Sequence, residues 1–259
     1  MALKTKEDIV NNWLPRYTGT AVEEFGEYFL LTNFGNYINK FAKRFNAPIK
    51  GIDKPMQTCT NKDGLTIVNF GIGSPMAAII MDLLVAANPK AVLFLGKCGG
   101  LKKSSEIGHF ILPIAAIRGE GTSNDYIHPK VPAMPSFKLH KFVSEKIVEA
   151  ETDYRTGVVY TTNRRVWEHD EEFKDQLIRT RAIAVDMETA TLFSVGIHNE
   201  IPRGALLLVS DTPMTPEGVK TEASDKIVTE KFVDLHIDIG IKAMTEIGAL
   251  GEKMKHFRY

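Results

Sequence analysis

The sequence predicts one α/β domain, built on a mostly parallel or mixed β-sheet that helices cover. The chain has 259 residues, of which 44% are hydrophobic, so it can bury one sizeable core. Short aliphatic and β-branched runs alternate with helical patterns. Most of these runs are too apolar to be exposed. We therefore expect a single domain over residues 1–259.

The short apolar runs are expected to form the strands of this sheet. Their β-branched and aliphatic residues are typical of buried strands. The expected strands cover residues 28–32, 65–70, 91–95, 109–114, 158–161, 182–185 and 205–209.

Two helices have clear sequence signals. Ser74 is expected to cap a buried helix that has Pro75 in its first turn and ends near Asn88. The last helix carries apolar residues at spacings of three and four, which predicts a stripe facing the core. These residues are Val228, Phe232, Leu235, Ile239 and Ala243.

Charge and cysteine content exclude several classes of protein. Lys+Arg and Asp+Glu both number 32, so we expect no general surface for nucleic acid or for an anionic membrane. Cys59 and Cys98 are the two cysteines, and their spacing predicts neither a metal site nor a disulfide framework. The polar residues 1–13 and the lack of a long apolar run predict a soluble, cytoplasmic protein without a membrane span.

Two glycine-containing segments at strand ends are candidate ligand-binding turns. "IVNFGIGSP" leads into the N-terminus of a helix, where free N–H groups favour a phosphate or another polar ligand. "FLGKCGGL" adds Lys97, a positive charge at the carboxyl edge of the sheet, where open α/β sheets bind ligands. Both segments are also compatible with ordinary tight turns. Cys98 has no base or metal ligand near it in the sequence, which favours packing or a backbone contact over a nucleophile.

Three carboxylates follow apolar strands. Asp186 and Glu188 flank Met187 at a junction between strand and helix, where each could cap the helix, or one could project into a pocket and accept sugar hydroxyls. Asp211 ends the run "ALLLVSDTP". It suits a turn, but partial burial there would also let it hold a proton for general acid catalysis.

Two further features could contribute to a site. Trp167, in "NRRVWE", could stack on a base or could anchor a helix. Residues 118–135, "RGEGTSNDYIHPKVPAMP", have neither helical nor strand periodicity and predict a long loop. Loops of this length are often functional, so this one is a candidate wall or lid.

The motifs "FGIGSP", "LGKCGGL", "AIAVDMETAT" and "LLVSDTP", in this order, resemble the purine nucleoside phosphorylase and uridine phosphorylase superfamily. Within it, "RYTGTAVEEFGEYFLLTNFGNYINKF" and "NRRVWE" resemble the AMP nucleosidase family. The resemblance runs from Arg16 to about Met244. It implies a three-layer α/β/α fold and hydrolysis of AMP to adenine and ribose 5-phosphate, with no cofactor and no metal. The longer members of that family have an added N-terminal domain, which we do not expect in these 259 residues.

The resemblance also implies roles for individual residues. Asp211 would protonate or hydrogen-bond N7 of the purine, and Glu188 would hold the ribose. The remaining contacts implied are Met187 at the sugar and base, Gly73 on the ribose-phosphate side, Cys98 and Gly99 lining the base pocket, and Trp167 beside the base.

The chain departs from the superfamily pattern at the phosphate site. It has neither the G-D-P-x-R turn after the first strand nor an arginine before the "CGG" glycines. We therefore expect water as the nucleophile, with the phosphate already on the substrate. The expected phosphate ligands are some of Asn33, Tyr37, Lys97 and Arg118, with an arginine such as Arg16 from a neighbouring subunit. The resemblance implies a homo-oligomer, with a hexamer built from dimers as the expected form.

Alternative functions are a phosphate-dependent purine nucleoside phosphorylase, a nucleosidase for an unphosphorylated or methylthio-nucleoside, and a non-catalytic nucleotide-binding module. The retained pair Glu188 and Asp211 argues against the last of these. A dehydrogenase that binds NAD is disfavoured because the glycine fingerprint lacks its third glycine.

Overall fold

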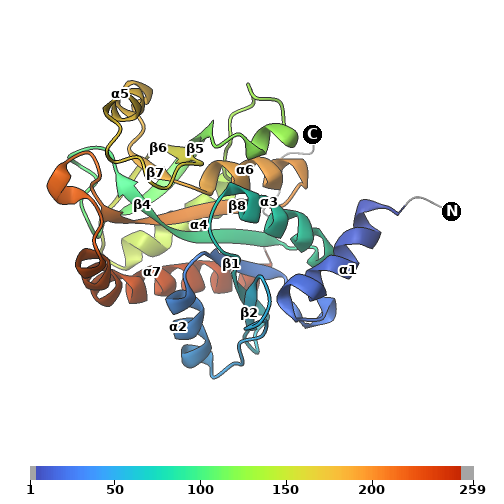
Figure 1. The fold of residues 1–259 in the computed structure, drawn as a ribbon. Helices are drawn as coiled ribbons and strands as arrows, with labels where there is room; N and C mark the ends of the chain where they lie inside the picture. Colours follow the sequence, from blue (N-terminus) through green and yellow to red (C-terminus); the bar gives the residue numbers. More distant parts are fainter. Residues whose placement is uncertain (1–3, 252–259) are drawn as a thin grey trace.

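The computed structural model describes residues 4–251, which share one eight-stranded sheet with helices around it (Figure 1). The strands are β1 (Tyr28–Thr32), β2 (Gln57–Thr60), β3 (Leu65–Asn69), β4 (Ala91–Gly100), β5 (Phe110–Gly119), β6 (Tyr154–Thr162), β7 (Ala184–Asp186) and β8 (Arg203–Asp211). Their order is β2-β3-β1-β4-β7-β6-β5-β8, and β4 also pairs with β8.

The sheet is mixed and mostly parallel, as predicted. The parallel pairs are β1–β3, β1–β4, β4–β8, β5–β6 and β6–β7. The antiparallel pairs are β2–β3, β4–β7 and β5–β8. Because β8 pairs with both β4 and β5, the strands β4, β7, β6, β5 and β8 close into a ring, a feature that the sequence did not predict.

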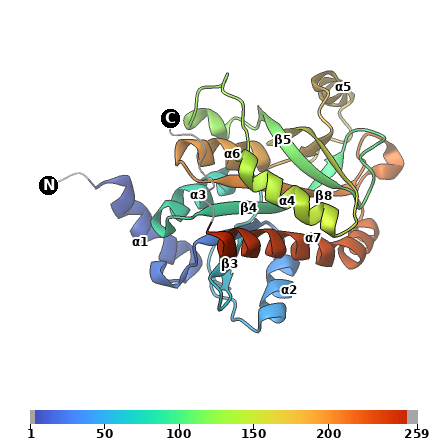
Figure 2. The same cartoon turned by 180° about the vertical axis from the view of Figure 1, so that it is seen from behind.

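Helices cover both faces of the sheet. The helices are α1 (Lys6–Thr18), α2 (Gly35–Phe45), α3 (Ser74–Leu83), α4 (Phe137–Glu149), α5 (Glu171–Thr180), α6 (Thr189–His198) and α7 (Glu222–Leu250). One core joins the sheet to α1, α3 and α6, and a second joins it to α2, α4 and α7. Figure 2 shows α7 running along its face of the sheet, with α2 and α4 beside it.

The two cores follow from the alternation of side chains along each strand. In β1, Phe29 and Leu31 belong to the core with α1 and α3, whereas Leu30 belongs to the core with α2 and α7. All three side chains are fully buried. Successive strand residues point to opposite faces, so a strand covered on both faces reads as a continuous apolar run. The strands could therefore be predicted from these apolar runs.

The strand β4 is longer than the predicted run 91–95. All of its residues are buried, including the "GKCGG" segment that we expected to be a turn. A Cβ at Gly99 would lie 2.8 Å from Cγ of Pro213, and one at Gly100 would lie 2.3 Å from the Ser105 carbonyl oxygen. These glycines therefore allow close packing inside a strand, and the prediction of a turn is wrong.

Two other local predictions need correction, and one strand was missed. Ser74 does not cap α3 with its side chain: the cap residue is Gly73, and Ser74 Oγ donates instead to the Met187 carbonyl oxygen, at 2.7 Å. The helix predicted to reach Asn88 ends at Leu83 and continues as a 3₁₀ turn. The strand β2 was not predicted.

The stripe predicted on the last helix is confirmed for part of its length. Val228, Ile239 and Ala243 are buried, and Phe232 and Leu235 pack against the same core while remaining partly exposed. No helix among residues 4–251 is long and apolar enough to cross a membrane.

The close approach of two glycines near β1 gives a stability prediction. A Cβ on Gly26 would lie 1.7 Å from the Gly64 carbonyl oxygen, so Gly26→Ala must displace backbone. Overpacking of this kind costs roughly 1–3 kcal/mol of unfolding free energy, which urea denaturation would measure. Gly35→Ala is the matched control, because a Cβ there meets nothing within 4 Å. Equal stability of the two variants would contradict the crowding at Gly26.

Candidate active site

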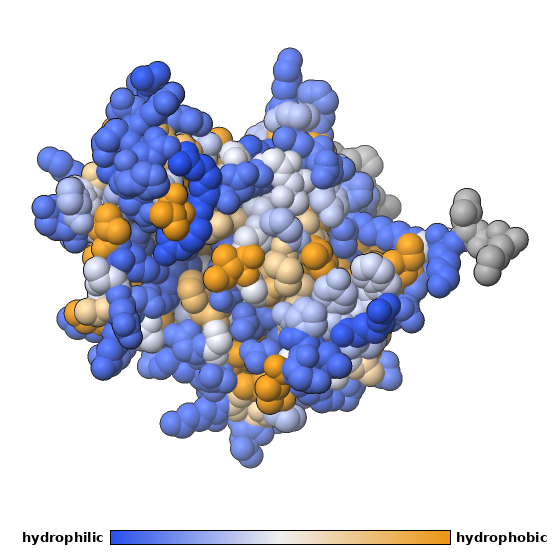
Figure 3. Space-filling view, viewed as in Figure 1, coloured by the Kyte–Doolittle hydropathy of each residue, from blue (hydrophilic) through white to orange (hydrophobic). Residues whose placement is uncertain are grey.

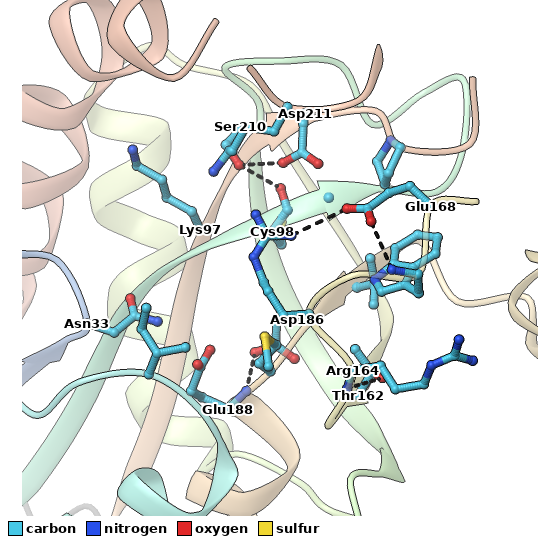
Figure 4. Close-up of a pocket in the computed structure, with 18 of the residues that line it drawn as sticks. Asn33, Lys97, Cys98, Thr162, Arg164, Glu168, Asp186, Glu188, Ser210 and Asp211 are labelled. Atoms are coloured by element: carbon cyan, nitrogen blue, oxygen red, sulfur yellow. Dashed lines mark hydrogen bonds and ion pairs between the residues drawn. The ribbon is translucent and has the colours of Figure 1, made fainter. Parts of the chain in front are cut away.

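A cavity of about 230 Å³ opens where several strands of the sheet end (Figure 4). Its lining comes from the ends of β4, β6, β7 and β8, from the segment after β1 and from the segments that follow β6 and β8. The lining residues are Asn33, Phe34, Ile72, Lys97, Cys98, Gly99, Thr162, Arg164, Arg165, Trp167, Glu168, Val185, Asp186, Met187, Glu188, Ser210, Asp211, Pro213 and Lys220.

Asp186 has a structural task at one end of this cavity. Its carboxylate accepts hydrogen bonds from Thr161 Oγ1 at 2.7 Å, from the Thr189 amide at 2.8 Å and from the Glu188 amide at 3.3 Å. The Thr189 hydroxyl donates to it as well. Asp186 therefore satisfies the first amides of α6 and ties this helix to β6.

Glu188 is left to face the cavity. Its Oε1 accepts a hydrogen bond from the Gly73 amide at 2.8 Å, and the Asn33 side chain provides a further hydrogen bond. The residue is only 2% exposed. Of the two carboxylates that could have capped the helix, one does so and the other projects into the pocket.

Burial sets the protonation of this pair. It raises the pKa of Glu188 to about 8, and the negative charge of Asp186 adds to the shift. Burial also raises the pKa of Asp186, but hydrogen bonds from Thr189, Thr161 and the Glu188 amide oppose that shift. Because Asp186 has more donors, we assign the negative charge to it and the proton to Glu188 near neutral pH.

Asp211 lies at another part of the cavity, at the end of β8 (Figure 4). Burial raises the pKa of its carboxyl, while Ser210 Oγ, Lys220 and Arg165 act in the opposite direction. Ser210 Oγ donates to Asp211 Oδ1 at 2.6 Å and fixes the orientation of the group. A carboxylic acid with a raised pKa at the wall of a cavity is suited to general acid catalysis.

Lys97 lines the cavity, but its charge is matched within the protein. Its Nζ lies 2.9 Å from Asp225 Oδ1 and donates to Thr229 Oγ1 at 3.2 Å, and it sits 4.9 Å from the centre of the Phe34 ring. Lys220 Nζ lies 3.2 Å from the same Asp225 oxygen. Burial lowers the pKa of Lys97, and the Asp225 carboxylate counteracts this shift.

Most of the predicted site residues come together in this cavity. Lining it are Asn33, Lys97, Cys98, Gly99, Trp167, Met187, Glu188 and Asp211. Gly73 reaches the site through its hydrogen bond to Glu188. Trp167 both lines the cavity and packs edge-on against Phe173, with 5.4 Å between ring centres. Burial raises the pKa of the Cys98 thiol well above its usual value, as expected for a packing residue.

Tyr37, a predicted phosphate ligand, does not line the cavity. Its hydroxyl hydrogen-bonds His236 Nδ1 at 2.8 Å inside the core, and the other imidazole nitrogen contacts the Leu206 carbonyl oxygen at 2.9 Å. Since a carbonyl only accepts, Nε2 carries the proton and Nδ1 accepts from the Tyr37 hydroxyl. We therefore remove Tyr37 from the set of phosphate ligands.

Arg118 is also placed elsewhere. Its guanidinium donates to the hydroxyl of Ser123, to the side chain of Asn124 and to the carbonyl oxygens of residues 127, 128 and 131. It therefore holds the loop predicted at 118–135, which packs on α3 through the Tyr126 hydroxyl and Asp82, at 2.7 Å. No residue of this loop lines the cavity, so its predicted part as a wall or lid and that of Arg118 as a phosphate ligand are corrected.

The structure adds charged residues that the sequence analysis did not select. Arg164, Arg165 and Glu168 follow β6, and Lys220 follows β8. The first three belong to the "NRRVWE" motif, of which only Trp167 was predicted to contact the ligand. Lys220 had no local signal. Within residues 4–251 there is no cluster of three His, Cys, Asp or Glu side chains that could hold a metal ion.

The sheet, the two surrounding helix layers and this cavity define a nucleoside phosphorylase-like protein. The family model of the phosphorylase superfamily matches residues 30–245, and the chain belongs to this superfamily.

Within this superfamily, the chain is similar to AMP nucleosidases and, at lower identity, to a uridine phosphorylase. The chain is 50% identical to an AMP nucleosidase from Bacteroides thetaiotaomicron of known crystal structure, with a TM-score of 0.86, over 95% of this chain and 99% of that one. It is 28% identical to the AMP nucleosidase of Escherichia coli, over 93% of this chain and 59% of that protein. A uridine phosphorylase of Treponema pallidum is 25% identical over 74% of this chain and 80% of its own length. The chain thus spans about three fifths of the curated AMP nucleosidases that it matches.

The position of Tyr37 predicts a loss of stability without a loss of substrate affinity. Tyr37→Phe leaves Nδ1 of His236 without a donor in the core, which costs about 1–3 kcal/mol. Urea denaturation would measure this loss. The KM for a phosphorylated substrate should not change, and a large rise in KM with unchanged stability would restore Tyr37 as a ligand.

The raised pKa of Glu188 predicts a pH-dependent stability. The folded state keeps a proton on Glu188 that the unfolded state releases, so this contribution is complete below the ordinary pKa of 4.5 and is lost as the pH rises through about 8. Glu188→Gln cannot lose that proton. The melting temperature of the variant should therefore gain on the wild type between pH 5 and pH 9. A difference that stays constant across this range would show that Glu188 is charged throughout.

Proposed function

We propose that this protein hydrolyses the N-glycosidic bond of AMP to adenine and ribose 5-phosphate. The observation that carries the proposal is the presence of two carboxyls, Glu188 and Asp211, whose pKa values burial raises and which stand at separate positions of one cavity. The 50% identity to an AMP nucleosidase over nearly the whole of both chains supports this substrate over other nucleosides and nucleotides.

Asp211 acts on the leaving base. Cleavage of the C1'–N9 bond passes through a state in which the sugar resembles an oxocarbenium ion and the purine gains negative charge. A neutral Asp211 carboxyl can donate its proton to N7 and so neutralise the departing base. The hydrogen bond from Ser210 to Oδ1 keeps the carboxyl in one orientation, which leaves Oδ2 to face the base.

Glu188 acts on the sugar. Its carboxyl is fixed by the Gly73 amide and by Asn33, and it lies beside Met187 at the start of α6. A carboxyl group held in this way can exchange hydrogen bonds with two neighbouring ribose hydroxyls. This contact orients the ribose relative to Asp211.

Water is the proposed nucleophile, because the chain lacks the G-D-P-x-R turn and the arginine with which its phosphorylase relatives bind inorganic phosphate. The substrate phosphate is held by basic and amide groups of the cavity. After removal of Tyr37 and Arg118, the candidates are Asn33 and Lys97, joined by Lys220. Asp225 pairs with both lysines in the structure and holds them in one place.

We also propose that the protein acts in the cytoplasm as one catalytic domain and as a homo-oligomer, with a hexamer built from dimers. In that assembly Arg16 of a neighbouring subunit would reach the phosphate. These proposals rest on the family resemblance.

A substrate panel tests the reaction. AMP, adenosine, inosine and methylthioadenosine would each be incubated with and without inorganic phosphate, and the free base would be followed by chromatography. We expect release of adenine from AMP that does not depend on phosphate. Release from adenosine or inosine only after addition of phosphate would establish a phosphorylase instead.

The role of Asp211 predicts a large loss of turnover in Asp211→Asn. General acid catalysis is typically worth about 10²- to 10⁴-fold, so kcat for AMP should fall by a factor in this range. Circular dichroism would verify that the variant is folded. Asp234→Asn is the control, because this carboxylate is exposed on α7 and forms a surface ion pair with Lys40. Wild-type turnover in Asp211→Asn would remove Asp211 from the mechanism.

A further inference from the structure

Glu168 is a second carboxylate at the Asp211 part of the cavity, and neither the sugar contact nor the proton transfer uses it. Figure 4 shows both side chains on the wall formed by the end of β8 and the segment after β6. The negative charge of Glu168 also acts on Asp211, whose pKa it helps to raise. Because both groups line one cavity of only about 230 Å³, a single base bound there can contact both.

The position of Glu168 is fixed by its neighbours. Trp167 is 4% exposed and packs on Phe173, which anchors the segment between β6 and α5. The Trp167 amide donates to Glu168 Oε2 at 2.9 Å, and Arg165 Nη1 lies 3.3 Å from Oε1. Only 17% of the Glu168 side chain is exposed. A carboxylate that is held and partly buried in this way is preorganised to bind a ligand.

Glu168 has acceptor capacity left after its contacts within the protein. An ionised carboxylate only accepts hydrogen bonds, and its two oxygens offer about four acceptor sites. The Trp167 amide and Arg165 occupy two of these sites. Glu168 thus presents free acceptor capacity to the cavity, next to Asp211, which presents a donor.

A donor beside an acceptor is the complement of one edge of adenine. On that edge adenine carries N7, an acceptor, next to the N6 amino group, a donor. Guanine and hypoxanthine carry N7 next to O6, so that edge has two acceptors. Asp211 could donate to N7 in every purine, but Glu168 could accept only from a 6-amino group and would repel O6.

We propose that Glu168 binds the exocyclic amino group of the base and makes the site selective for 6-aminopurines over 6-oxopurines. This inference rests on the proposed function in one respect, the placement of N7 at Asp211. In this proposal Glu168 determines which base binds, whereas Asp211 protonates the base and Glu188 binds the ribose.

The kinetic test compares AMP with IMP, which differ at the 6-position and in the proton that N1 carries in IMP. Wild-type protein should have a much higher kcat/KM for AMP. In Glu168→Gln the side-chain amide can donate to O6, so the ratio of kcat/KM for AMP to that for IMP should fall about tenfold or more, as expected for the loss of one good base contact. An unchanged ratio would overturn the inference.

Glu172→Gln is the matched control, because it makes the same chemical change on the exposed face of α5, where Figure 3 shows a hydrophilic surface. Its ratio of AMP to IMP should equal that of the wild type. A merely structural role of Glu168 would lower kcat/KM for both nucleotides alike and would leave their ratio unchanged.

Binding of free bases separates this inference from the proposed function. Calorimetry with adenine, hypoxanthine and unsubstituted purine needs no hydrolysis and no folded variant. Wild-type protein should bind adenine about tenfold or more tightly than purine, which keeps N7 but lacks the amino group, and should bind hypoxanthine more weakly still. If AMP is not hydrolysed but this order holds, the proposed reaction fails and the role of Glu168 stands. If purine binds as tightly as adenine, the role of Glu168 is refuted.

Discussion

The hydrogen bond from the Gly73 amide to the Glu188 carboxyl is the contact on which the rest of the site depends. It joins the turn between β3 and α3 to the junction between β7 and α6, two segments 115 residues apart in the chain. A second bond, from Ser74 Oγ to the Met187 carbonyl oxygen, runs beside it. Gly73 has φ = 95°, a conformation that side chains rarely adopt, so the turn presents its amide to Glu188 because the residue is glycine. The geometry on the sugar side of the cavity therefore depends on how the start of α3 packs against the start of α6.

Three carboxyl groups close to one cavity impose a cost on the fold. Burial raises the pKa of Asp186, Glu188 and Asp211, which means that each charged form is less stable there than in water. Hydrogen-bond donors offset this cost, but they are distributed unequally among the three carboxyl groups. Most of the available donors surround Asp186, whereas Glu188 and Asp211 have fewer donors to offset the effect of burial on their pKa values. Proteins commonly give up stability at functional sites in this way.

The sequence predicted the framework of the fold because both faces of most strands are covered. It left open whether Asp186 and Glu188 both cap the helix or one of them lines a pocket, and the structure assigns capping to Asp186 and the pocket to Glu188. It failed where a contact depends on the direction of one side chain. Tyr37 lies one turn before Phe41 on the buried face of α2, and this helical spacing was the available sign that it belongs to the core.

Other residues were missed or misplaced because their positions depend on contacts that are distant in the sequence. Glu168 and Lys220 reach the cavity only because the segments after β6 and β8 meet there, and this meeting follows from the closure of the strand ring. Arg118 lies near the end of β5, next to the predicted loop, and was expected to contact the phosphate, yet its donors bind carbonyl oxygens of that loop. In each case the position of the side chain is set by a segment distant in the sequence or by a backbone carbonyl oxygen, and neither can be recognised from neighbouring residues.

The most direct test of the account is a crystal structure with a C-nucleoside analogue of AMP, whose glycosidic bond cannot be hydrolysed. The account predicts that the Asp211 carboxyl lies within hydrogen-bond distance of N7 and that the Glu188 carboxyl contacts the ribose hydroxyls. An analogue bound with its base at Glu188, or with neither carboxyl in contact, would contradict it.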